Sequence, residues 1–172
     1  MLKTFNTNLS NLNFSGATEY ATKAYNLLPG KKVYINFSED DQFKLSTTYF
    51  NLAYYFQTQN NFSLCEEISL LVLEIQKRLV NQNPEKYNPT YATTINNLGI
   101  FYHRNNKPKE AEEMYLTSFN IRKELAEKNP KKYELYYAII TNNLGCLYGY
   151  ENINIEKAKE MGEFLKYKPY LV

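Results

Sequence analysis

The sequence predicts an all-α protein built as an array of antiparallel helix hairpins. Three observations support this fold class. The segment Asn96-Asn97-Leu98-Gly99 recurs 46 residues later as Asn142-Asn143-Leu144-Gly145 and 46 residues earlier, in part, as Asn51-Leu52-Ala53. The flanking Asn-Pro pairs, Asn83-Pro84 and Asn129-Pro130, keep the same period. Apolar residues between these markers recur every three or four positions, which is the spacing of one helix face. A fixed period of this length indicates stacked repeats.

Length and composition restrict the class of protein further. The chain has 172 residues, of which 44% are hydrophobic, enough for one domain with a core. Its net charge of +2 comes from scattered Lys and Glu, which argues against a nucleic-acid-binding face. No run approaches the ~20 apolar residues of a membrane span, and residues 1–13 lack the apolar core of a signal peptide. We therefore expect a cytoplasmic protein without nucleic-acid or membrane partners.

The two cysteines, Cys65 and Cys146, are far apart in the sequence and lie inside apolar helical patterns. This placement predicts buried free thiols, not a disulfide framework, and it fits a reducing compartment.

The first 37 residues are expected to form a partial leading repeat and a connector. Helical spacing over Ser15–Leu28 ends at Pro29-Gly30, a strong stop signal. Residues 29–37 follow as an ordered loop. An alternative is a short extended piece, because Val33, Ile35 and Phe37 alternate with polar residues.

The first full repeat is predicted over residues 38–83. Ser38 followed by three acidic residues is a helix start, and this helix is expected to reach about Gln59. Asn60-Asn61 turns the chain, because Asn tolerates the left-handed backbone conformation. The second helix covers about residues 63–80 and carries an apolar stripe of Leu64, Ile68, Leu71, Ile75 and Leu79.

The second and third repeats are predicted over residues 84–129 and 130–166, with a tail at 167–172. In the second repeat, Asn83-Pro84 caps a first turn and Pro89 starts the main helix, which ends near Arg104. Its second helix ends near residue 128 and has a stripe of Ala111, Met114, Ser118, Ile121 and Leu125. The third repeat has a first helix ending near Tyr150 and a short second helix, so it exposes an edge unless the tail covers it.

These motifs resemble tetratricopeptide repeats. The family pattern is Leu-Gly with an aromatic three residues later, a turn, and then Ala with a large residue four positions later. The second repeat has this pattern in full as Leu98-Gly99, Tyr102, Ala111 and Tyr115. The 46-residue period exceeds the common 34 residues. It is similar to the long-helix Asn-Asn-Leu-Gly variety of kinesin light chains and bacterial regulatory proteins. The resemblance implies a right-handed solenoid with a concave groove.

Candidate binding residues lie on the first helix of each repeat, offset by two residues from the core stripe. Two residues rotate the direction by about 200°, so these side chains point away from the core. In the resembled family this face lines the groove. The predicted groove residues are Thr47, Asn51, Tyr54, Thr58, Thr93, Asn97, Ile100, His103, Arg104, Ile139, Asn143 and Tyr150. Cys146 lies on the same stripe.

The expected function is non-catalytic binding of a protein or peptide partner in the groove. Asn51, Asn97 and Asn143 form a ladder of amides, each of which can bond the N–H and C=O of an extended peptide. The alternative for these asparagines is a solvated surface. The alternative function is self-association or docking through the exposed edge of the last repeat. Some proteins of the resembled family bind the C-terminal carboxylate of chaperones through basic residues on the groove stripe of the third repeat. Ile139 and Asn143 occupy those places here, so we predict no such binding.

The sequence contains no recognisable catalytic, metal or cofactor site. His103 is the only histidine and has no cysteine near it in sequence, so a position at the rim of the groove is the expected role. The six glycines are scattered and form no phosphate loop. We therefore expect no enzyme activity, no metal and no cofactor.

Overall fold

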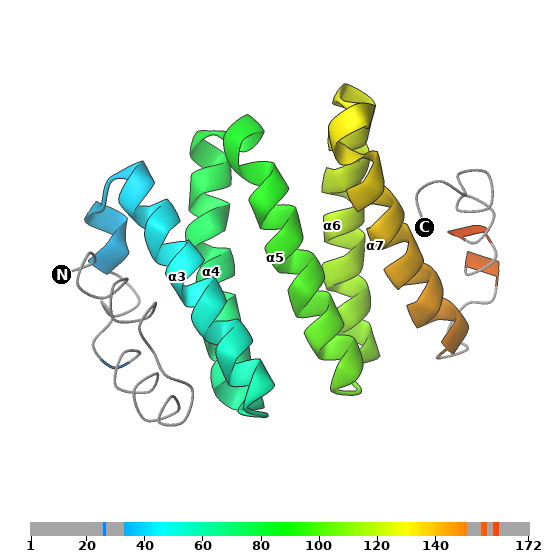
Figure 1. Cartoon of the computed structure of the whole chain (residues 1–172), viewed down its shortest axis with the longest axis horizontal. Coiled ribbons are helices and arrows are strands. Elements are labelled where there is room, and N and C mark those ends of the chain that lie inside the picture. The colour runs from blue at the N-terminus through cyan, green and yellow to red at the C-terminus, as the bar shows by residue number, and fades with distance from the viewer. Residues whose placement is uncertain (1–25, 27–32, 151–155, 158–159, 162–172) are drawn as a thin grey trace. The chain divides into compact units, whose positions relative to one another are not determined.

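A computed structural model describes residue 26, residues 33–150, residues 156–157 and residues 160–161. The chain divides into two compact units, Met1–Pro84 and Glu85–Val172. The predicted helices before Val33 and after Tyr150, and the tail at 167–172, fall largely or wholly outside the described residues. Within residues 33–150 every regular element is helical (Figure 1), so the all-α prediction is confirmed there.

The first unit contains a short 3₁₀ helix and a helix hairpin. The elements are η2 (Val33–Asn36), α3 (Glu39–Thr58) and α4 (Phe62–Gln82), and α3 packs along α4. Residues 33–36 form a 3₁₀ helix, so the extended alternative for this segment is wrong. Tyr34 explains the placement of the 3₁₀ helix, because its ring is buried and its hydroxyl donates to Glu74 of α4.

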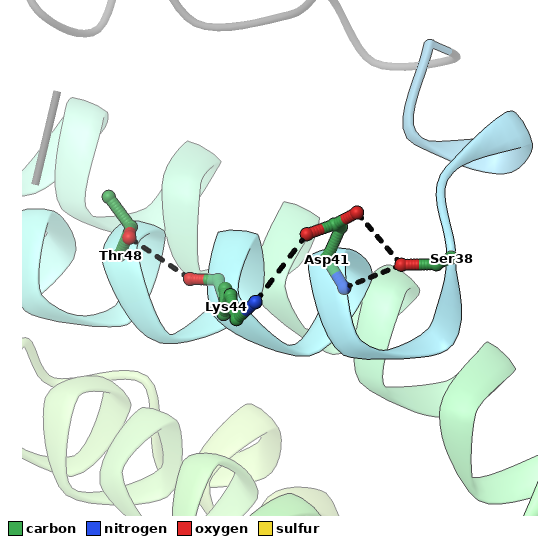
Figure 2. A network of polar contacts seen from close by, with 4 residues as sticks. All are labelled: Ser38, Asp41, Lys44 and Thr48. Carbon is green, nitrogen blue, oxygen red and sulfur yellow. Dashed lines mark hydrogen bonds and ion pairs between the residues drawn. The ribbon is translucent and has the colours of Figure 1, made fainter. Parts of the chain in front are cut away.

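Helix α3 begins at the predicted cap. The Ser38 hydroxyl oxygen accepts a hydrogen bond from the backbone N–H of Asp41 at 3.2 Å and donates one to the Asp41 carboxylate at 2.8 Å (Figure 2). Lys44 lies 3.7 Å from the same carboxylate. The cap satisfies one of the N–H groups that a helix start leaves unpaired, and the acids complement the positive end of the helix dipole.

The second unit consists of α5 (Pro84–Arg104, whose first residue closes the first unit), α6 (Pro108–Lys128) and α7 (Pro130–Tyr150). Helix α6 packs against α7, and it contacts α5 where Ser118 donates to the carbonyl of Ala92 at 2.9 Å. Helix α5 begins at Pro84, not at Pro89 as predicted. Pro89 lies inside the helix and deprives the Glu85 carbonyl of its donor. Glu85 is exposed, so water can reach the region of this carbonyl.

Asparagine ends both α3 and α5 in the predicted way. Asn60 and Asn106 have φ of 56° and 57°, the left-handed conformation. Around Asn60, the Asn61 N–H bonds the Phe56 carbonyl at 2.9 Å. Around Asn106, the Lys107 N–H bonds the Tyr102 carbonyl at 2.9 Å. These are the bonds of a Schellman motif, which turns the chain while satisfying the last carbonyls.

The family-like glycine lies at a close helix crossing. A Cβ atom at Gly99 would lie 2.5 Å from the Tyr115 ring of α6, so only glycine fits there without movement. Ala111 is fully buried beside this crossing, and Tyr102 and Tyr148 are buried as the motif predicts. At Gly145 a Cβ would lie 3.3 Å from Met161 Cβ, the nearest atom among the described residues and a less severe contact than that at Gly99.

The buried face of α6 differs from the prediction. The predicted stripe contained Met114, Ile121 and Leu125, which are only half-buried. The buried residues are Ala111, Tyr115, Ser118 and Arg122, which also follow helical spacing. The prediction was right for Ala111 and Ser118 and wrong for the other three residues, because the buried face includes Arg122, which is 4% exposed and was not part of the predicted stripe. In α4, by contrast, the predicted Ile68, Leu71, Ile75 and Leu79 are buried, and only Leu64, in the first turn, is half-buried.

Candidate peptide-binding face

The predicted groove residues of α5 lie on one stripe of the helix that does not enter the core. Asn97 and Arg104 are exposed, and Thr93 and Ile100 are half-buried. His103 borders this stripe, and its ring meets the Tyr115 ring edge-on at 6.5 Å. This stripe therefore offers an amide, an apolar side chain and a cation along one line.

Helix α7 presents a similar stripe within the same unit. Ile139 is 41% exposed, Asn143 is half-buried and Cys146 is exposed. The expectation that both thiols are buried is thus wrong for Cys146 and confirmed for Cys65. Burial is the main cause that raises the pKa of the Cys65 thiol. The side chain of Tyr150, at the end of the helix, lies outside the described residues.

The predicted residues of α3 belong to the first unit. Thr47, Asn51, Tyr54 and Thr58 are all exposed, and Tyr54 reaches 64%. The hydroxyls of Thr47 and Thr58 donate to carbonyls of their own helix, those of Phe43 and Tyr55. Tyr54 is therefore the large apolar group that this stripe presents to solvent.

A chain of amides connects α5 to α7. The Asn143 amide nitrogen donates to the Asn96 side-chain oxygen at 2.9 Å, and Asn96 donates to the Asn97 side-chain oxygen at 3.4 Å. Asn96 is only 5% exposed. Sequence reasoning singled out Asn97 and Asn143 but missed Asn96, whose burial differs from that of its exposed equivalent Asn142. One donor of Asn143 is therefore used within the unit.

Toward their N-termini, the stripes of α5 and α7 lead to a pocket. The spacing of four and three residues continues backwards to Lys86 and Thr90 on α5, and to Lys132 and Tyr136 on α7. These residues line a pocket of about 590 Å³, to which α6 contributes Arg122. The stripes of α5 and α7 thus run into the lining of this pocket within the second unit.

Arg122 is the residue of this face that sequence reasoning missed. One nitrogen of its guanidinium donates to the Tyr136 carbonyl at 3.0 Å and another to the Thr93 hydroxyl at 3.3 Å. A signal was available: Arg122 continues the spacing Ala111, Tyr115, Ser118, and it is one of only three arginines in a lysine-rich chain. Desolvation lowers its pKa, but guanidinium remains protonated in proteins.

Two buried tyrosines of the second unit, Tyr115 and Tyr148, have raised pKa values. Burial raises the pKa of Tyr115 to about 12. Burial and a hydrogen bond to Glu112 also raise the pKa of Tyr148. Both hydroxyls are therefore protonated at neutral pH. Within the described part of the chain, no three His, Cys, Asp or Glu residues gather in a way that could hold a metal ion.

The second unit thus has the architecture of a helix-hairpin repeat with two exposed stripes that lead to a pocket. Residues 92–130 match the family model of the tetratricopeptide repeat, which covers the second half of α5 and all of α6. No curated protein matches the chain. Among the described helices, none combines the length and apolar character needed to cross a membrane.

Proposed function

We propose that the chain is a binding module that holds an extended peptide or a segment of a partner protein on the exposed stripes of α5 and α7 in the second unit, and that the α3 stripe of the first unit offers side chains of the same kind. The matched family is generally a protein–protein interaction scaffold. The observation that carries the proposal is the pair of matching stripes on α5 and α7, which run in the same unit to one pocket. Their members combine amides with exposed apolar groups.

The chemistry of these stripes suits a peptide. Asn97 is exposed and its side-chain amide offers two donors and an acceptor, so it can bond backbone groups of any sequence. Asn143 keeps one amide N–H and its oxygen beyond the bond to Asn96. Leu135, Tyr136 and Ile139 are exposed on α7 by 50%, 47% and 41%, and they supply apolar contacts for ligand side chains.

Peptide display followed by titration tests the proposal. Random peptides are selected on the full chain, and the affinity of a selected peptide is measured by fluorescence anisotropy. Asn97→Ala should weaken binding by about tenfold, because one or two hydrogen bonds of ~1 kcal/mol each are lost. The matched control is Asn120→Ala, the same change at an exposed position of α6. Equal affinities for wild type and Asn97→Ala would contradict the proposal.

Self-association through the last repeat remains the alternative function. Residues 151–172, on which it depends, lie mostly outside the described part of the chain, and no observation there favours it. Light scattering over a range of protein concentrations separates the two functions: a binding module stays monomeric at micromolar concentration, whereas an assembly module gains mass.

A further inference from the structure

The pocket at the N-terminal ends of α5 and α7 contains a buried cation, Arg122, that has no carboxylate partner among the described residues. Its Cζ lies 5.3 Å from the centroid of the Tyr136 ring, which is a cation–π contact with a neutral group. Arg122 is 4% exposed, and both acceptors of its guanidinium, the Tyr136 carbonyl and the Thr93 hydroxyl, are neutral. Its Nε is buried and has no hydrogen-bond partner among the described residues. Two hydrogen bonds use two of the five N–H donors of a guanidinium. A buried charge in this state is costly unless an anion completes it.

The surroundings of Arg122 favour an anion. Lys86 and Lys132 line the same pocket at equivalent positions of two repeats, 46 residues apart, and Glu85 is the only carboxylate among the described residues of the lining. Lys86 and Glu85 lie in the first turn of α5, and Lys132 lies in the first turn of α7. The positive ends of the α5 and α7 dipoles therefore lie at the pocket together with a formal excess of cations, and they outnumber the one negative end, that of α6, whose last turn supplies Leu125.

The first unit lacks this arrangement. The residue equivalent to Arg122 is Gln76 of α4, which is also buried, at 3% exposure. Lys86 and Lys132 share one equivalent position in the first repeat, and it is occupied by Asp40. The equivalent positions of the first repeat thus lack the three cations, and glutamine is a side chain that this place in the helix pair accommodates.

We propose that the pocket binds a carboxylate of an acidic peptide through Arg122, with Lys86 and Lys132 at its sides. This inference rests on the proposed function, because the stripes that would hold the peptide lead into the pocket. A planar carboxylate suits a single guanidinium flanked by the Tyr133 and Tyr136 side chains that also line the pocket. A phosphate group has more acceptor oxygens, and its sites generally gather several arginines.

The scarcity of arginine makes a direct test practical. In ¹H–¹⁵N spectra of the full chain, the Nε–H signals come from Arg78, Arg104 and Arg122 alone. Arg122→Gln identifies the Arg122 signal, and circular dichroism checks that the variant folds. The probes are sodium acetate, N-acetyl-glutamate amide for a side-chain carboxylate, N-acetyl-alanine for a C-terminal carboxylate, N-acetyl-glutamine amide as the neutral control, and inorganic phosphate.

We expect the Arg122 signal to shift and saturate with carboxylate probes while the signal of exposed Arg104 stays in place. The relative affinities of the side-chain and C-terminal probes tell which carboxylate enters. An unmoved Arg122 signal, an equal shift with the neutral amide, or a preference for phosphate would overturn the proposal.

Display-selected peptides give a second, independent measurement. They should be enriched in Asp or Glu or end in a free carboxylate, and Arg122→Gln should weaken their binding about 10- to 100-fold. Lys132→Gln changes only an exposed side chain and should weaken binding a few-fold, which keeps the test valid if Arg122→Gln unfolds. Peptides that need Asn97 but are indifferent to Arg122 and Lys132 would refute the carboxylate pocket alone. Carboxylate binding at Arg122 without any selected peptide would refute the peptide-binding function alone.

Discussion

At the scale of single residues, the packing of the second unit depends on a few close contacts that leave little space for a different side chain. Gly99 lies against the Tyr115 ring, and the Asn96 amide is enclosed between α5 and α7. Each of these contacts joins two helices, so each converts a local change into a change of packing.

Gly99→Ala should destabilise the protein. Alanine gains ~1 kcal/mol of helix propensity over glycine, but its Cβ would lie 2.5 Å from the Tyr115 ring. Overpacking typically costs ~1–3 kcal/mol, so the net free energy of unfolding should fall. Urea unfolding measures it. Gly145→Ala is the matched comparison, because a Cβ there would lie 3.3 Å from Met161 Cβ, a less severe contact, and it should cost less than Gly99→Ala. Equal effects at both glycines would contradict the tight crossing.

Asn143→Ala should also cost stability, about 1–2 kcal/mol, because it leaves the buried Asn96 oxygen without its donor. Asn142→Ala, the same change at the exposed neighbouring position, should cost nothing measurable. The sequence pattern alone predicts no loss for either, since both asparagines lie off the core stripe. Thermal melts of the two variants compare them, and identical melting temperatures would show that the Asn96–Asn143 bond contributes nothing.

The raised pKa of Tyr115 predicts that the stability of the protein falls at alkaline pH. Its pKa in the folded protein is about 12, above the unfolded value of about 10. Its contribution is fully present below pH ~10 and is lost as the pH rises toward 12. Between pH 10 and 12, the free energy of unfolding of wild type should therefore fall by about 1 kcal/mol per pH unit relative to that of Tyr115→Phe. Urea titrations at pH 8, 10 and 11 measure it. A difference that does not vary with pH would contradict this prediction.

At the scale of elements, helix ends were predictable and helix faces were less so. Ser38, Asn60 and Asn106 end or start helices as their local chemistry predicts, because caps depend on neighbouring residues. The start of α5 was predicted wrongly, because a proline inside a helix looks like a helix start in the sequence. The burial of Arg122 was missed because its acceptors, Thr93 and the Tyr136 carbonyl, come from two other helices.

The turn between α5 and α6 gives a prediction at this scale. Asn106 has φ of 57°, which β-branched residues adopt only with strain. Asn106→Val should lower the free energy of unfolding by about 1–2 kcal/mol, whereas Asn106→Gly should be neutral or slightly stabilising. Chemical denaturation of both variants provides the comparison. Asn105→Val is less informative because the Asn105 side chain donates to the Phe101 carbonyl at 2.7 Å. A valine as stable as the glycine would show that the turn adapts.

At the scale of the whole molecule, the 46-residue period connects sequence to function. The period places asparagine at equivalent positions of α3, α5 and α7, namely Asn51, Asn97 and Asn143. The structure shows that Asn51 and Asn97 are exposed, and that Asn143 is partly engaged by Asn96. Sequence reasoning could identify these positions because periodicity is local. It could not foresee the pocket, which needs three helices of one unit to come together.

The same period predicts that Asn51 in the first unit and Asn97 in the second act alike. Asn51→Ala should weaken the selected peptides that contact the α3 stripe by about tenfold, as Asn97→Ala should for those that contact the α5 stripe. Titrations of the selected peptides against wild type, both variants and Asn120→Ala measure this directly. An Asn51→Ala variant that binds every peptide as wild type does would confine binding to the stripes of α5 and α7, because a side chain that contacts no part of the ligand has no differential free energy to contribute.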